Sequence, residues 1–246
     1  MQKEIRNKNN SLLVSEVFYS IQGEGQTMGV PSVFLRLGGC NILCQSKHWV
    51  CDTIEVWRKS KATLFEDVLD EEQTMRIVQQ NAHLVITGGE PLIHQIAIEN
   101  YLEWFKSKYN IKPIIEVETN GTILATTYLA KVVDYWNCSP KLSTAGEQNP
   151  KHIRLNLLVL KDLNDMTFGK TIFKFVISSN EDVDEIFKDF GVDSIIDRRK
   201  IVFMPAGSSQ DELVQTRLFV AEKARYLGVR YSDRLHVVIW NLKTGV

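Results

Sequence analysis

The sequence lacks an excess of charge of either sign. Its 246 residues carry 29 Lys and Arg against 30 Asp and Glu, which gives a formal net charge of -1, and no dense basic run occurs. A surface that binds nucleic acid normally carries a basic patch or stripe. The composition therefore gives no electrostatic support for a nucleic-acid partner.

Long apolar segments are also missing. No stretch approaches the about 18 apolar residues of a transmembrane helix. The first ten residues, MQKEIRNKNN, lack the apolar run of a signal peptide. We therefore expect a cytoplasmic protein with no membrane partner. Its length and its 44% hydrophobic content favour one domain over residues 1–246, with residues 1–12 as a flexible N-terminal extension.

Cysteine is scarce and unevenly distributed. Cys40, Cys44 and Cys51 fall within twelve positions, whereas Cys138 is far from them. Because a chain without an export signal keeps its thiols reduced, clustered cysteines indicate metal ligands or catalytic groups rather than disulfides. Cys138 is expected to be a thiol of the core.

Short β-type runs alternate with helical patterns along the chain. This alternation predicts a parallel α/β sheet. Six strands are too few for an eight-stranded barrel, so a partial TIM-like barrel or an open doubly wound sheet is expected. The predicted strands are Ser32–Leu37, His83–Thr87, Pro113–Glu118, Val132–Cys138, Thr171–Ile177 and Lys200–Met204. The predicted helices are Glu71–Gln80, Ile93–Lys108, Ile123–Val132, Asp182–Phe190 and Asp211–Leu227.

Polar, mostly glycine-containing segments follow four of these strands. They are Gly38–Cys40, Gly88–Pro91, Thr119–Gly121 and Ser139–Lys141. The carboxyl ends of parallel strands form the active face of such folds. The pattern therefore predicts a functional site at that edge of the sheet.

The three clustered cysteines are typical of a metal site. Three thiolates in one loop can hold an iron–sulfur cluster, and three ligands for four irons leave one iron open. A structural zinc site with His48 as fourth ligand stays open on spacing alone. Three unrelated buried thiols are the third interpretation.

The segment Gly88–Pro91 favours the cluster. Its two glycines allow a ligand close to the backbone, Glu90 offers a carboxylate acceptor, and Pro91 can begin a helix. Beside a cysteine loop, such a turn suits an amino-acid ligand such as S-adenosylmethionine. An ordinary tight turn has the same pattern.

These segments resemble signatures of the radical S-adenosylmethionine superfamily and, within it, of the 7-carboxy-7-deazaguanine synthases. The matching pieces keep the family's order from about residue 14 onwards. They are Phe18–Gly25, Gly29–Pro31, Phe34–Leu37, Cys51–Thr53, Val85–Pro91, Glu118–Gly121, Ser139–Lys141, Phe203–Gly207 and Leu235–Val237. The chain departs from the family where six residues, not two, separate Cys44 from Cys51. We interpret Gln45–His48 as a four-residue insertion.

The resemblance implies a carbon–nitrogen lyase with a partial six-stranded barrel, active as a homodimer. Its implied cofactors are a 4Fe–4S cluster, S-adenosylmethionine and Mg²⁺. A 5′-deoxyadenosyl radical would start the conversion of 6-carboxy-5,6,7,8-tetrahydropterin to 7-carboxy-7-deazaguanine, with loss of ammonia, in queuosine or other deazapurine biosynthesis. A flavodoxin or ferredoxin would supply the electron.

The resemblance also implies residue roles. The cluster ligands are Cys40, Cys44 and Cys51, and Thr53 binds Mg²⁺. The substrate-binding residues are Ile21, Gln22, Gly23, Glu24, Arg36, Thr87 and Val246. The residues that bind S-adenosylmethionine are Gly88, Gly89, Glu90, Ser139, Pro140, Lys141 and Ser178.

Simpler interpretations stand beside these roles. Arg36 suits a bidentate carboxylate, but in an apolar strand it equally suits a buried ion pair. Thr53 can simply stabilise a turn. His236 is expected in the core, and His94 on a helix surface. Two other functions share parts of the pattern: a glycyl-radical activase and a zinc-stabilised binding protein without catalysis.

Overall fold

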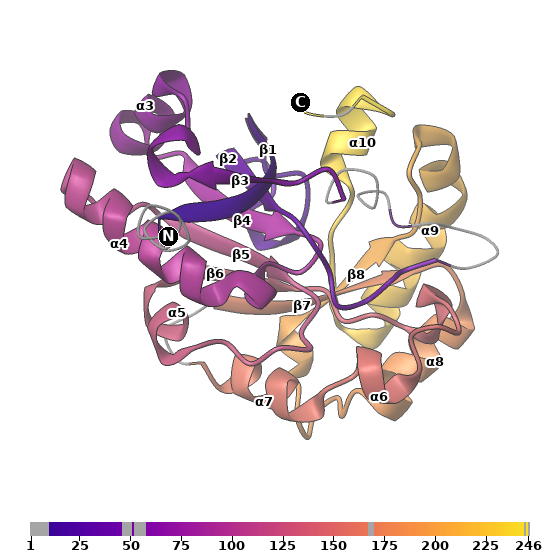
Figure 1. The fold of residues 1–246 in the computed structure, drawn as a ribbon. Helices are drawn as coiled ribbons and strands as arrows, with labels where there is room; N and C mark the ends of the chain where they lie inside the picture. The colour runs from indigo at the N-terminus through magenta and orange to yellow at the C-terminus, as the bar shows by residue number, and fades with distance from the viewer. Residues whose placement is uncertain (1–9, 46–50, 52–57, 167–169, 244, 246) are drawn as a thin grey trace.

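The computed structural model describes residues 10–45, 51, 58–166, 170–243 and 245. Within them, one nine-stranded sheet has the order β3-β1-β2-β4-β5-β6-β7-β8-β9 (Figure 1). Its strands are β1 (Ser11–Ile21), β2 (Pro31–Leu37), β3 (Lys61–Leu64), β4 (His83–Gly88), β5 (Ile115–Thr119), β6 (Tyr135–Cys138), β7 (Lys170–Ile177), β8 (Ile201–Pro205) and β9 (Arg230–Tyr231).

The six predicted strands are confirmed as β2, β4, β5, β6, β7 and β8, which pair in parallel in this order. The short strand β9 adds to β8 in parallel, whereas β1 pairs antiparallel with both β2 and β3. The described sheet begins at β3 and ends at β9, so it does not close on itself. This arrangement confirms the predicted α/β class and is consistent with a partial barrel.

Helices cover the outside of the curved sheet in Figure 1. The five predicted helices correspond to α3 (Glu71–Gln80), α4 (Gln95–Tyr109), α5 (Thr127–Val132), α8 (Asn180–Asp189) and α9 (Gln210–Leu227). Those not predicted are α6 (Lys151–Arg154), α7 (Leu157–Asp165) and α10 (Leu235–Trp240). None of the helices in the described ranges is long and apolar enough to span a membrane.

Alternation along the strands separates an apolar face from a polar one. On β5, Ile115 and Val117 join the main core, whereas Glu116 and Glu118 bond to side chains on the opposite, inner face. Lys174 on β7 likewise alternates with core side chains and faces inward. The inner face can therefore hold polar chemistry while the outer face supplies the core.

The predicted flexible N-terminal extension needs correction. The N-terminal extension does not reach residue 12, because Ser11 and Leu12 belong to β1 and Leu12 is buried in the core. Residues 1–9 lie outside the described ranges.

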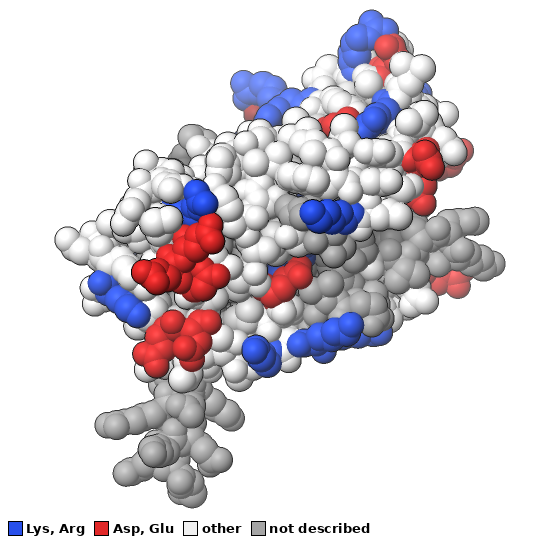
Figure 2. Space-filling model, turned by 90° about the horizontal axis from the view of Figure 1, so that it is seen from above, with Lys and Arg blue, Asp and Glu red and all other residues white. Residues whose placement is uncertain are grey.

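Figure 2 shows basic and acidic side chains interspersed over the visible face, without a continuous basic field. This distribution agrees with the balanced composition.

Candidate active site

The polar segments meet at the carboxyl ends of the parallel strands, as the sequence predicts. The backbone N–H of Glu90 donates to the carbonyl of Gly39 at 3.0 Å, which joins the segment after β4 to the one after β2. The N–H of Ser139 donates to the carbonyl of Thr119 at 2.7 Å, which joins the next two. One edge of the sheet thus carries all four segments.

Glu90 is fully buried and clamps this edge from inside. Its carboxylate accepts hydrogen bonds from the N–H of Leu92 (3.0 Å), the N–H of Asn120 (2.6 Å) and the hydroxyl of Thr119 (2.9 Å). Burial raises the pKa of Glu90, and these donors together with the charge of Lys141 partly offset that rise. These three donors fix the carboxylate in the turn after β4, and its predicted contact with S-adenosylmethionine stays a prediction.

Gly88 and Gly89 allow the turn to touch the cysteine loop. A β-carbon on Gly89 would lie 2.2 Å from the carbonyl oxygen of Gly39 and 2.6 Å from Cβ of Cys40. Gly88 has φ +153°, and a β-carbon there would lie 2.3 Å from the carbonyl oxygen of Leu37. Backbone alone fits here, so main-chain groups form this wall of the site.

The three clustered cysteines come together in one small group. Cys44 is buried with Ala145, and Cys40 and Cys51 pack against them. The N–H of Cys51 donates to the carbonyl of Cys44 at 2.9 Å, which closes the loop. Cys138 is fully buried in the separate main core, as predicted.

Asn149 anchors the cysteine loop from a segment about a hundred residues away. Its Oδ1 accepts from the N–H of Leu43 at 3.1 Å, and its Nδ2 donates to the carbonyl of Leu43 at 2.7 Å. The N–H of Gln45 donates to the carbonyl of Ala145 at 3.0 Å. Sequence reasoning missed this support, because no local pattern connects the two segments.

The packing of the three cysteines against one another suits an iron–sulfur cluster. In such a cluster each cysteine binds a different iron. Burial raises the pKa of the Cys40 thiol to about 11, with Lys141 acting in the opposite direction. Bound iron would stabilise the thiolate that burial disfavours.

The segment after β6 is internally braced. Nζ of Lys141 donates to Oγ of Ser139 at 3.0 Å, and the Lys141 carbonyl accepts from Arg154 at 3.0 Å. Pro140 between them is buried. His94 is half-buried, and its Nε2 lies 2.7 Å from the carbonyl oxygen of Gly38, so it contacts the site's edge rather than lying on a helix surface.

A polar network on the inner face centres on Gln22, which follows Ile21 at the end of β1. Its Nε2 donates to Glu116 at 2.7 Å and to Glu118 at 3.2 Å. The hydroxyl of Thr87 donates to Glu118 at 2.7 Å. Gln22 and Thr87, both predicted substrate residues, therefore belong to one connected network.

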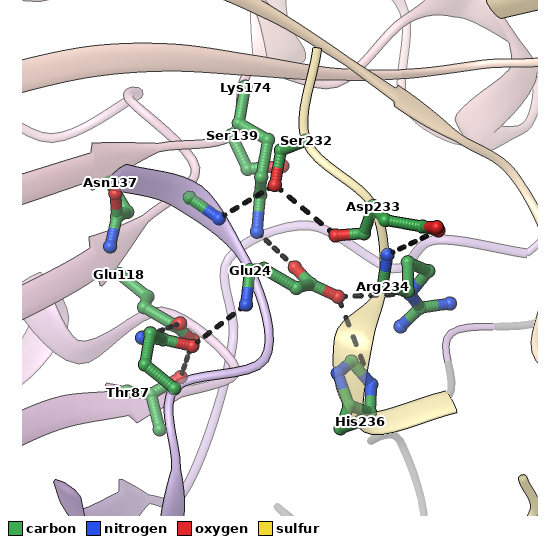
Figure 3. Close-up of polar contacts among 12 residues, drawn as sticks. Glu24, Thr87, Glu118, Asn137, Ser139, Lys174, Ser232, Asp233, Arg234 and His236 are labelled. Atoms are coloured by element: carbon green, nitrogen blue, oxygen red, sulfur yellow. Dashed lines mark hydrogen bonds and ion pairs between the residues drawn. The ribbon is translucent and has the colours of Figure 1, made fainter. Parts of the chain in front are cut away.

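Glu24 lies beside this network and is surrounded by basic side chains (Figure 3). Its Oε2 contacts Nζ of Lys174. Its Oε1 lies 2.9 Å from Nε of Arg234 and 3.9 Å from Nε2 of His236. Burial alone would raise the pKa of Glu24, but the three neighbours outweigh it, and the pKa lies well below its usual value. The carboxylate is therefore ionised.

The segment before α10 closes over the loop after β1. The N–H of Leu235 donates to the carbonyl of Gly23 at 2.8 Å, and the N–H of Gly25 donates to Oγ of Ser232 at 3.1 Å. His236 is only half-buried and faces Glu24, so its expected place in the core was wrong. The histidine is held outside the core because α10 lies against the site.

Arg36 and Ser178 have partners within the protein. Nε of Arg36 lies 2.7 Å from Oε1 of Glu16, which is the ion pair that the sequence left open as an alternative. Oγ of Ser178 donates to Oδ2 of Asp182 at 3.0 Å, and Ser179 caps the start of α8. The geometry thus gives Ser178 a role in starting that helix.

Known proteins share both the cluster region and nearly the whole length of the chain. Residues 21–140 match a family model described as a 4Fe-4S single cluster domain. The 7-carboxy-7-deazaguanine synthase of Halobacterium salinarum is 34% identical over 94% of this chain and 91% of its own. That of Pyrobaculum aerophilum is 33% identical over 94% of this chain and 96% of its own. The chain belongs to the 7-carboxy-7-deazaguanine synthase family.

A solved structure supports the fold of this family member. QueE from Escherichia coli is 24% identical and superposes with a TM-score of 0.62, covering 92% of this chain and 95% of its own. The family assignment makes the chain a radical S-adenosylmethionine lyase that uses an iron–sulfur cluster and S-adenosylmethionine. The predicted family and enzyme class are therefore confirmed.

Some predicted residues lie outside the described ranges. They are Thr53, the predicted Mg²⁺ ligand, His48 in the insertion, and Val246 at the end of the given sequence. Their roles stay predictions.

Sequence reasoning missed the partners that hold the predicted substrate residues. Glu116, Lys174 and Arg234 were not singled out. A signal existed for two of them, because a charged residue that alternates with apolar ones in a predicted strand faces the side opposite the core. Arg234 offered no such signal, since its partner Glu24 is 210 residues away.

Proposed function

We propose that this chain converts 6-carboxy-5,6,7,8-tetrahydropterin to 7-carboxy-7-deazaguanine with loss of ammonia. The observation that carries the proposal is the meeting of two features at one end of the sheet. The cysteine loop touches the backbone of Gly89, and the polar network of Gln22, Thr87 and Glu118 lies on the adjoining inner face. The cysteine loop suits an iron–sulfur cluster with its bound cofactor, and the polar network suits a pterin.

Cys40, Cys44 and Cys51 would hold the cluster, and the backbone at Gly88 and Gly89 would meet S-adenosylmethionine. When bound, these groups supply the 5′-deoxyadenosyl radical that starts the reaction. The part of the protein is to bind, orient and shield. Ser139–Lys141 offers further polar groups beside the loop.

Polar inner-face residues would orient the pterin. Glu24 is ionised and accepts hydrogen bonds, which suits the amino and N–H edge of a pterin. Arg36 uses Nε on Glu16, but a guanidinium has five N–H donors, so donors remain for the substrate carboxylate. Thr53 would hold Mg²⁺, since its hydroxyl and the substrate carboxylate would be the oxygen ligands that this ion prefers. A homodimer and a flavodoxin-like or ferredoxin-like electron donor complete the proposal.

An anaerobic assay tests this function. The reconstituted protein should hold about four irons and four sulfides and should form 7-carboxy-7-deazaguanine from the carboxytetrahydropterin with S-adenosylmethionine and a reductant. Cys51→Ala should lose cluster and turnover. Cys138→Ala is the matched control and should keep both, because that thiol lies in the main core. A wild-type protein that carries the cluster but forms no product would refute the substrate assignment.

A further inference from the structure

Lys174 is a buried lysine on the inner face of the sheet. Only 6% of the residue is exposed, and its neighbours along β7 belong to the apolar core. A lysine is seldom buried to this degree unless its charge is paired. Its ammonium contacts Oε2 of Glu24 from the strand side, opposite the chain segment that carries Arg234 (Figure 3).

The two cations contact different oxygens of the Glu24 carboxylate. Lys174 contacts Oε2, and Nε of Arg234 contacts Oε1 at 2.9 Å. A carboxylate offers about four acceptor positions, so each oxygen keeps capacity for another donor. The loop that carries Glu24 is also fixed, because its N–H donates to Oε1 of Gln22 at 3.2 Å. These partners therefore fix the direction from which the Glu24 carboxylate can accept a further hydrogen bond.

We infer that Lys174 is a positioning residue, which holds Glu24 ionised and oriented so that it accepts hydrogen bonds from the donor edge of the pterin. This inference rests on the proposed function. Lys174 itself need not touch the substrate. Arg234 comes from the segment before α10, whereas Lys174 ties the carboxylate of Glu24 to strand β7.

The charges around the pair support this role. Glu24 faces Lys174 from β7 and both Arg234 and His236 from the C-terminal segment, and Lys174 also feels Glu118 from β5. Burial lowers the pKa of Lys174, but Glu24 and Glu118 more than offset this, so the lysine stays protonated. Without its charge, the pKa of Glu24 rises, and protonated Glu24 offers fewer acceptor positions.

The test compares three lysine variants of the reconstituted holoenzyme. Lys174→Met should raise KM for the pterin about tenfold with a smaller change in kcat. Lys174→Arg keeps the charge and should hold KM close to the wild-type value. Lys161→Met removes an exposed lysine paired with Asp165 and should behave as wild type.

A double-mutant cycle covers the case in which Lys174→Met folds poorly. Glu24→Gln combined with Lys174→Met removes both charges together, which avoids an unpaired buried ion. If Lys174 acts through Glu24, the lysine change should add little to KM in the Glu24→Gln background. An equal effect in both backgrounds, or a kcat loss without change in KM, overturns the inference. A wild-type enzyme without activity would instead count against the proposed function.

Discussion

Two glutamates, the fully buried Glu90 and the partly buried Glu24, lie on different sides of the site and are stabilised in opposite ways. Glu90 accepts mainly from neutral donors, two backbone N–H groups and one hydroxyl, and burial raises its pKa. Glu24 meets Lys174, Arg234 and His236, and its pKa falls despite burial. The comparison shows that the partners, not burial alone, decide whether a carboxylate is a structural clamp or a fixed charge.

The difference matches the neighbours of each residue. The Glu90 turn supports the cysteine loop, where thiolates and a bound cluster leave little use for another negative charge. The Glu24 loop lies beside Gln22 and Thr87, where a charged acceptor suits a ligand rich in N–H groups. Each prediction below disturbs one side and leaves the other intact.

The largest effect is expected at Gly89, which joins the Glu90 turn to the cysteine loop. Gly89→Ala would place a β-carbon 2.2 Å from the carbonyl oxygen of Gly39. Neither backbone can yield cheaply, so Cys40 must shift, and a displacement of about 1 Å can cost about a hundredfold in rate. We expect turnover to fall by that order and iron content to drop, as measured by anaerobic assay and iron analysis.

Gly228→Ala is the matched control for this substitution. Gly228 ends α9 with φ +67°, and a β-carbon there would meet nothing within 4 Å. The strain of about 1–2 kcal/mol should lower stability only. Normal iron content and turnover in Gly89→Ala would show that the turn does not set the position of the cysteine loop.

The next effect concerns the clamp itself. Glu90→Ala leaves the N–H groups of Leu92 and Asn120 and the hydroxyl of Thr119 without their buried acceptor. We expect a loss of about 3–5 kcal/mol in the free energy of unfolding, measured by anaerobic denaturant unfolding. Glu66→Ala removes an exposed glutamate and should change stability little. A loss below about 1 kcal/mol would contradict the clamp.

The sequence predicted the central sheet well because each strand carries apolar residues on the face that packs against the helices, either as a run or in alternation with polar residues. It failed at the edges. Strand β1 was missed because its register shifts between Val14 and Glu16, which breaks the alternation. Strand β3 is mostly exposed, and β9 has only Arg230 and Tyr231, so their pairing depends on neighbouring strands rather than on local pattern.

The prediction of the site likewise succeeded for local motifs and missed the contacts between distant segments. Residues in local motifs, such as Cys40 and Gly89, were found where the sequence placed them. The partners that decide their chemistry come from distant segments: Asn149 braces the cysteine loop, and Arg234 and His236 reach Glu24. The motif predicted Glu90 at the site but could not show which donors surround its carboxylate.

The smallest predicted effect is on the pH dependence of stability, which should change in opposite directions when Glu24 and Glu90 are substituted. Because the pKa of Glu24 in the folded protein is lowered from 4.5, its contribution to stability is present above about pH 4.5 and is lost as the pH falls further. Glu24→Gln should therefore cost about 1.5–3 kcal/mol at neutral pH, the range for hydrogen bonds to charged groups. The difference in unfolding free energy between Glu24→Gln and wild type should become smaller as the pH falls below about 4.5.

Glu90→Gln should show the opposite trend, because the raised pKa of Glu90 makes its contribution greatest below 4.5 and smaller as the pH rises through the folded-state value. Unfolding of wild type and both variants, followed anaerobically between about pH 3 and pH 8, measures the two slopes. Parallel curves for the two variants would mean that cations and neutral donors stabilise these carboxylates alike. Curves that diverge in opposite directions would establish Glu24 as the fixed charge of the site and Glu90 as its clamp.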